Sequence, residues 1–121
     1  MAFKRKFLGG YEFSGNMKGW METFQGWHKQ DVGERDISFD RYFAVIFGWY
    51  HTVVKDMWVK QGRAHEVKEM NAIEITMQKN PQLRQIAAYD SVDYMAERMD
   101  LSDMKLLGPQ ARAFTKKELG I

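Results

Sequence analysis

Residues 42–50 form a run of nine residues, YFAVIFGWY, in which no side chain is charged and five are aromatic. The run belongs to a longer segment, residues 39–58, whose apolar positions recur at the spacing of an α-helix. Apolar side chains nearly surround this helix, and a helix of that kind is buried in protein or placed in lipid. The chain must therefore fold in a way that covers residues 39–58.

The length of the apolar run favours burial in protein over burial in lipid. Thirteen residues, 42–54, make a helix of about 20 Å at a rise of about 1.5 Å per residue, whereas a bilayer core is about 30 Å thick. Charged side chains on both sides prevent the run from being extended. These charges belong to Asp40, Arg41, Lys55 and Asp56. Membrane contact through residues 39–58, as a tilted helix inside a membrane complex, is the alternative.

A row of small residues interrupts the bulky side chains of this helix. Ala44, Gly48 and Thr52 are spaced by four, which places them on one side of a helix. Small residues in this arrangement let a second helix approach closely, and without such a contact Gly48 would cost about 1 kcal/mol of helix stability relative to alanine. A chain of 121 residues buries only part of its surface. We therefore expect a partner subunit to cover part of the helix.

The whole chain predicts a mainly α fold in one domain, residues 1–121, with a long aromatic-rich central helix and shorter flanking helices. Residues 1–15 hold three glycines among four aromatic residues, which disfavours a helix and predicts an irregular N-terminal arm. Residues 16–79 carry the aromatic helices, and residues 80–121 carry more polar ones.

Capping residues predict where the helices of the first half begin. Asn16 is expected to cap a helix that runs to about Lys29, and Ser38 to cap the central helix, which runs to about Lys60. A continuation of this helix past Gly62 is left open.

Asn80-Pro81 is the clearest boundary in the sequence, because the residue before a proline avoids the helical region. It ends one helix at Lys79 and starts another, and a last helix over residues 110–119 is expected to stop at Gly120. Residues 73–78, IEITMQ, alternate apolar and polar side chains as a strand does. An α+β fold that pairs this segment with residues 42–47 is the alternative to the mainly α fold.

These features predict a non-enzymatic structural or accessory subunit that packs into a larger multi-protein assembly, such as a membrane-associated complex or a virus particle. Its partners are then other protein subunits. We expect the partner interface to consist of exposed aromatic residues and the row of small residues. The predicted interface residues are Phe3, Phe7, Tyr11, Trp20, Phe24, Trp27, Ala44, Gly48, Trp49, Thr52 and Trp58.

Charge disfavours a protein that binds nucleic acid mainly by electrostatics, because the net charge is only +2. A nucleic-acid-binding module remains the alternative function, since Lys4, Arg5 and Lys6 lie among the aromatic residues of the arm. The chain has no cysteine, which excludes thiolate metal sites and cysteine nucleophiles. The N-terminus has no apolar run of the length of a secretory signal. The compartment stays unknown.

Catalytic and cofactor-binding motifs are absent from the sequence, and no catalytic residue, metal or cofactor is predicted. His51, inside the apolar run, is interpreted as a hydrogen-bonded core histidine, with a buried ligand or proton carrier as the alternative. A row of acidic side chains is interpreted as a solvated or partner-facing stripe rather than a metal or acid/base site. This row consists of Asp90, Asp93, Glu97 and Asp100. An enzyme built around His51 or this row is the third hypothesis.

Overall fold

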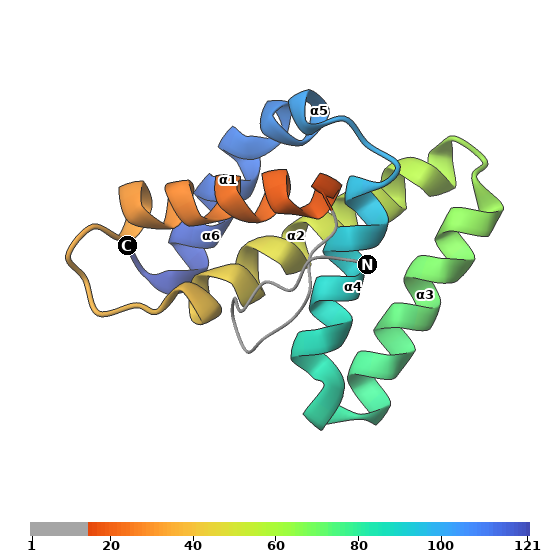
Figure 1. Cartoon of the computed structure of the whole chain (residues 1–121), viewed down its shortest axis with the longest axis horizontal. Helices are drawn as coiled ribbons and strands as arrows, with labels where there is room; N and C mark the ends of the chain where they lie inside the picture. The colour runs from red at the N-terminus through yellow and green to blue at the C-terminus, as the bar shows by residue number, and fades with distance from the viewer. Residues whose placement is uncertain (1–14) are drawn as a thin grey trace.

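The computed structural model describes residues 15–121, which form six α-helices and one short 3-10 helix and contain no strand (Figure 1). The mainly α prediction is confirmed, and the α+β alternative is wrong. Most of the predicted N-terminal arm lies outside the described residues. The helices are α1 (Gly15–Val32), α2 (Phe39–Lys60), α3 (Ala64–Lys79), η1 (Pro81–Leu83), α4 (Arg84–Ala96), α5 (Leu101–Leu106) and α6 (Gly108–Leu119).

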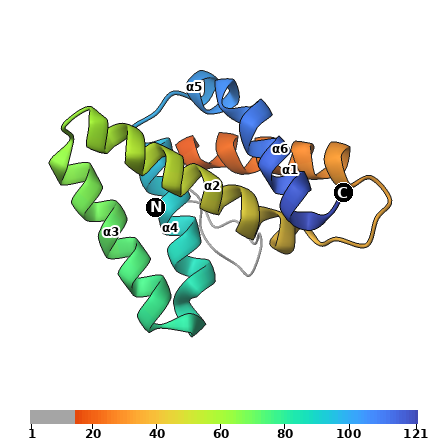
Figure 2. The same ribbon diagram turned by 180° about the vertical axis from the view of Figure 1, so that it is seen from behind.

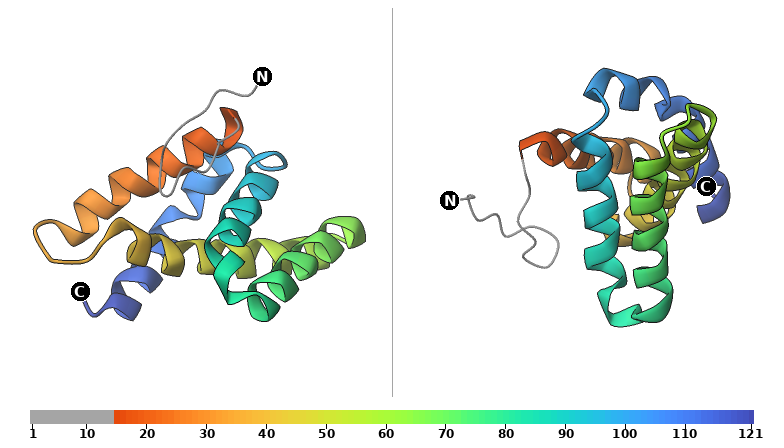
Figure 3. Two further views of the ribbon diagram at one scale, coloured as in Figure 1. Left: turned by 60° about the horizontal axis from the view of Figure 1, so that its bottom comes forward. Right: turned by 90° about the vertical axis from the view of Figure 1, so that its right-hand side faces the viewer.

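Helix α2 is the centre of the fold and contacts α1, α3, α4 and α6. Helices α3 and α4 pack side by side as an antiparallel pair that projects from the rest of the molecule (Figures 1 and 3). Helices α1 and α6 lie against the other end of α2, and α5 joins α4 to α6. The aromatic-rich helix therefore occupies the position that its apolar surface requires.

Helix α1 extends past the predicted end at Lys29 and stops at Val32. The extra turn ends at Gly33, whose φ of 62° lies in the left-handed region that glycine adopts without strain. Gln30 and Asp31 are polar residues beyond the predicted helix end. Asp31 belongs to the helix because its carboxylate has partners in two other helices, which the sequence does not show.

Helix α2 begins and ends as predicted. The Ser38 hydroxyl accepts a hydrogen bond from the Arg41 backbone N–H at 3.1 Å, which is the geometry of an N-cap. The helix does not continue into α3, because Gly62 adopts a φ of 73° and the chain turns there. The Arg63 N–H donates to the Trp58 carbonyl oxygen at 2.9 Å, which closes the C-terminus of α2.

The IEITMQ segment lies in α3 and is helical, so the strand prediction for residues 73–78 is wrong. The alternation of apolar and polar side chains does not match their burial. Ile75 is exposed, whereas the Glu74 side chain points toward His51 on α2. The helix ends at Lys79, as Asn80-Pro81 predicts. Asn80 makes no side-chain cap, and one 3-10 turn separates it from α4.

The hydrophobic core is one cluster, and the chain covers most of α2 with its own side chains. Only 7% of Phe47 and 0% of Tyr50 are exposed, while Trp49 is half-buried. The expectation that a chain of this size leaves these aromatic side chains uncovered is wrong for Phe47 and Tyr50. The reason is that α1, α3, α4 and α6 all pack against α2, and each supplies apolar side chains.

Candidate functional site

A buried polar network connects α2, α3 and α4 at His51, which is 4% exposed. The imidazole Nδ1 lies 2.6 Å from the Ser91 hydroxyl on α4, and Nε2 lies 2.8 Å from a Glu74 carboxylate oxygen on α3. The same carboxylate oxygen accepts from the Lys55 ammonium at 2.7 Å, and Lys55 also donates to Asn71. Every polar atom of the imidazole therefore has a partner.

The hydrogen-bond partners of His51 determine which ring nitrogen carries the proton. A carboxylate only accepts hydrogen bonds, so Nε2 carries the hydrogen and Nδ1 accepts from the Ser91 hydroxyl. Burial lowers the pKa of His51, even though Glu74 favours the charged imidazolium. Burial raises the pKa of Glu74, but the hydrogen bonds from Lys55 and His51 outweigh it and hold that pKa below the ordinary value. His51 is therefore neutral and Glu74 charged at neutral pH.

Ser91, His51 and Glu74 follow the order of a serine–histidine–carboxylate triad. Acyl transfer needs a hydroxyl that a substrate reaches, and Ser91 is 0% exposed. The serine lies between packed helices, so in this conformation the arrangement binds helices together rather than presenting a nucleophile. The interpretation of His51 as a hydrogen-bonded core histidine is confirmed.

A second network joins α1, α2 and α6 at Asp31, whose side chain is 4% exposed. Its carboxylate accepts from Arg112 Nη2 at 2.7 Å and Nε at 3.1 Å, and from the Tyr42 hydroxyl at 2.6 Å. Burial raises the pKa of Asp31, but the hydrogen bonds from Arg112 and Tyr42 together keep it below its ordinary value. The pair is charged at neutral pH and holds α6 against α1.

The predicted acidic row is not one face of a helix. Helix α4 ends at Ala96, so Glu97 and Asp100 lie in the turn that follows, beyond the helical positions of Asp90 and Asp93. Within residues 15–121, no group of three His, Asp or Glu side chains is arranged to hold a metal ion.

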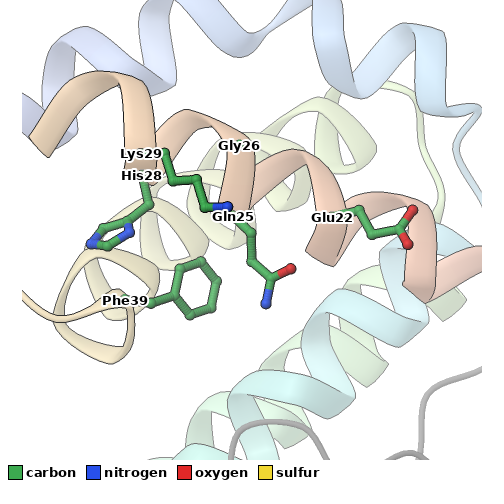
Figure 4. A pocket seen from close by; sticks show the side chains of 6 residues that line it. All are labelled: Glu22, Gln25, Gly26, His28, Lys29 and Phe39. Atoms are coloured by element: carbon green, nitrogen blue, oxygen red, sulfur yellow. The ribbon is translucent and has the colours of Figure 1, made fainter. Parts of the chain in front are cut away.

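A cleft of about 430 Å³ lies on the outer side of α1 (Figure 4). His28 and Phe39 form one end, and the His28 Nε2 lies 2.8 Å from the Ile37 carbonyl oxygen. Glu22 lies at the opposite end of the cleft and points away from the ring of His28 (Figure 4). No acid/base pair is formed between them, so the cleft offers polar contacts without a catalytic arrangement.

An apolar groove of about 470 Å³ lies between α2 and α6, two helices that pack side by side (Figure 2). A carbon atom added at Gly48 would meet nothing within 4 Å. Phe114 on α6 is 40% exposed. We call this surface the α2–α6 groove, and it is lined by Val45, Gly48, Trp49, Thr52, Val53, Phe114 and Glu118.

The predicted interface residues separate into four groups, the fourth of which is Trp27 alone. Gly48, Trp49 and Thr52 lie together at the α2–α6 groove, and Ala44 is exposed on α2 one turn before Gly48. Those buried inside the chain, which cannot form a surface, are Trp20, Phe24 and Trp58. Those outside the described residues are Phe3, Phe7 and Tyr11.

Trp27 is half-buried and packs inside the fold rather than on an open surface. The guanidinium carbon of Arg112 lies 5.4 Å from the centroid of the Trp27 ring, which is within the distance of about 6 Å for a cation–π pair. Trp27 therefore makes contacts within the chain, and its place in a partner interface stays a prediction.

Sequence reasoning missed Phe114 and Glu118, which form the α6 side of the groove. They are separated from Gly48 by more than sixty residues, and only the packing of α6 on α2 brings them there. The available signal was a large apolar residue, Phe114, among the polar and charged residues of the last helix.

None of the helices in residues 15–121 combines the length and the apolar character that crossing a bilayer requires. No protein-family model, no curated protein and no solved structure matches the chain.

Proposed function

We propose that this chain is a non-enzymatic accessory subunit that packs into a larger protein assembly through the α2–α6 groove. The observation that supports the proposal is the open apolar surface beside Gly48, since the other aromatic side chains of residues 15–121 are buried or half-buried. A contiguous exposed apolar surface of this kind is typical of a protein-binding site.

The composition of the groove supports a protein partner. Trp49 and Phe114 supply aromatic contact area of the kind enriched at interfaces. The small residues Ala44, Gly48 and Thr52 extend little from α2, so a helix of a partner can approach α2 closely there. The assembly we propose is a virus particle or a membrane-associated complex, in which this chain contacts protein.

Native capture from source material tests this function. We would compare the wild-type chain with Gly48→Trp, which fills the groove, and with Gly26→Trp, which adds the same side chain on α1. Both positions are helical, and an added carbon meets nothing within 4 Å at either one. Equal melting temperatures would show that both variants fold.

We expect the wild type and Gly26→Trp to retain the same set of proteins and Gly48→Trp to lose that set. Captures with and without mild detergent then separate a membrane complex from other assemblies. Retention of the set by Gly48→Trp, or no retained protein with the wild type, would contradict the proposed function.

A further inference from the structure

We propose that the α2–α6 groove is occupied by a second copy of this chain, with the two α2 helices packed antiparallel about a two-fold axis near Gly48 and Trp49. This inference rests on the proposed function, since it names the first contact that the groove makes. It is argued from the shape of the groove, from the charges at its two ends and from the direction of the helix.

The shape of the groove fits a copy of itself. In an antiparallel pair centred between Gly48 and Trp49, each glycine lies opposite the indole of the other chain. The space above Gly48 is empty, and Trp49 is half-buried beside it. A two-fold interface uses the same surface on both chains, so one partly exposed ring and the open space beside it satisfy both copies at once.

The charges that flank this surface are also self-complementary. Arg41 lies seven residues before Gly48 and Asp56 lies seven residues after Trp49, so the proposed axis places each Arg41 opposite the partner's Asp56. Both side chains are exposed, and neither has an ion pair among residues 15–121. The two residues are about 22 Å apart along α2 and cannot pair within one chain.

The helix dipole makes this placement unfavourable in an isolated chain. Arg41 lies in the first turn of α2, where negative charge is favoured, and Asp56 lies near the C-terminal end, where positive charge is favoured. An antiparallel neighbour brings an opposite charge to each of them. An anionic lipid surface attracts positive charge, whereas this groove is bordered by the carboxylates of Asp56 and Glu118 as well as by the cation Arg41.

Charge reversal tests the pairing with the folded chain. Arg41→Asp and Asp56→Arg each put like charges at both ends of the proposed dimer, while each places its new charge favourably in the helix dipole. Folding is therefore retained in both variants. Sedimentation equilibrium over a range of concentrations would measure the dissociation constant of each.

We expect the wild type to form a dimer and each single variant to dissociate about tenfold more readily. An equimolar mixture of the two variants restores opposite charges at both ends, so it should pair as the wild type does. The double variant Arg41→Asp/Asp56→Arg should also recover. Recovery of dimerisation in both the mixture and the double variant is expected only for an antiparallel pair of copies.

The inference would be overturned by a wild type that stays monomeric at every concentration, or by a mixture no tighter than its components. Binding of the monomer to anionic vesicles in place of pairing would also overturn it. If the wild type is monomeric while Gly48→Trp still abolishes native capture, the pairing fails and the proposed function stands. If the chain pairs but captures no other protein, the function fails and the pairing stands.

Discussion

Single buried polar residues hold helices of this fold together. His51 joins α2, α3 and α4 through Ser91 and Glu74, and Asp31 joins α1, α2 and α6 through Tyr42 and Arg112. In both cases the residue has all its hydrogen bonds only when distant segments of the chain are in place. Buried polar groups of this kind are costly to leave without partners.

Ser91→Ala removes the donor to His51 and leaves a buried ring nitrogen without a partner. We expect the free energy of unfolding to fall by about 1–3 kcal/mol, measured by urea denaturation at neutral pH. Ser102→Ala, at an exposed position of α5, is the control and should change it by less than about 0.5 kcal/mol. Equal effects of the two changes would mean that the network does not stabilise the fold.

Acid should destabilise the protein through His51. Because burial lowers the pKa of His51 in the folded chain, the unfolded chain takes up a proton first as the pH falls below about 6.5. The free energy of unfolding then decreases until the pH reaches the lower pKa of the folded state. Denaturation between about pH 7.5 and pH 5 should show this slope, and His51→Gln should flatten it. If the slope is unchanged in His51→Gln, other titratable groups cause the loss of stability in acid.

Two glycines in the helices of this molecule differ in how closely other side chains pack against them. Gly26 lies inside α1 with open space around it, whereas Gly108 begins α6 directly against Trp27. A carbon added at Gly108 would lie 2.7 Å from the Trp27 ring. The contact between α1 and α6 therefore depends on the absence of a side chain at one position.

Alanine at the two glycines should change stability in opposite directions. Gly26→Ala should stabilise the chain by about 0.5–1 kcal/mol, because alanine favours the helix and meets no neighbour. Gly108→Ala should destabilise it by about 1–3 kcal/mol, because the Trp27 ring must move. Thermal and urea unfolding of both variants would check the signs. A stabilised Gly108→Ala chain would mean that α6 does not pack this closely on Trp27.

At the scale of the whole molecule, all the long helices contribute to one core. The short helix α5 belongs to it as well, since the Tyr50 hydroxyl donates to the Met104 carbonyl oxygen at 2.6 Å. A shared core predicts unfolding in one cooperative step.

Tyr50→Phe should lower the free energy of unfolding by about 1 kcal/mol without separating α5 from the rest. Far-ultraviolet circular dichroism and tryptophan fluorescence should then report the same urea midpoint in the wild type and in the variant. A second transition seen by one probe alone would show that the helices do not unfold together.

The sequence predicted those features of the fold that neighbouring residues decide. The N-cap Ser38, the stop at Asn80-Pro81 and the central helix 39–60 follow from local geometry and apolar spacing. The strand pattern of residues 73–78 misled because burial against α2 and α4 outweighs alternation. In the candidate interface, the helical spacing placed Gly48 and Thr52 on one side of α2, and both line the α2–α6 groove.

Contacts between distant residues were not predictable from one sequence. Trp20, Phe24 and Trp58 were assigned to an interface because composition shows an excess of aromatic residues but not how helices pack to enclose them. The partners of His51 lie 23 and 40 residues away, beyond any local pattern. Phe114 was missed as a groove residue because it, too, is far in sequence from the α2 residues with which it lines the groove.

The ion pair of Asp31 and Arg112 has a consequence for how the chain is made. Arg112 follows Asp31 by 81 residues, so during translation the acid emerges long before the guanidinium that neutralises it. Until then α1 and α2 meet around a carboxylate that retains its water. We infer that α1 and α2 of the nascent chain do not pack firmly around Asp31 until α6 has left the ribosome.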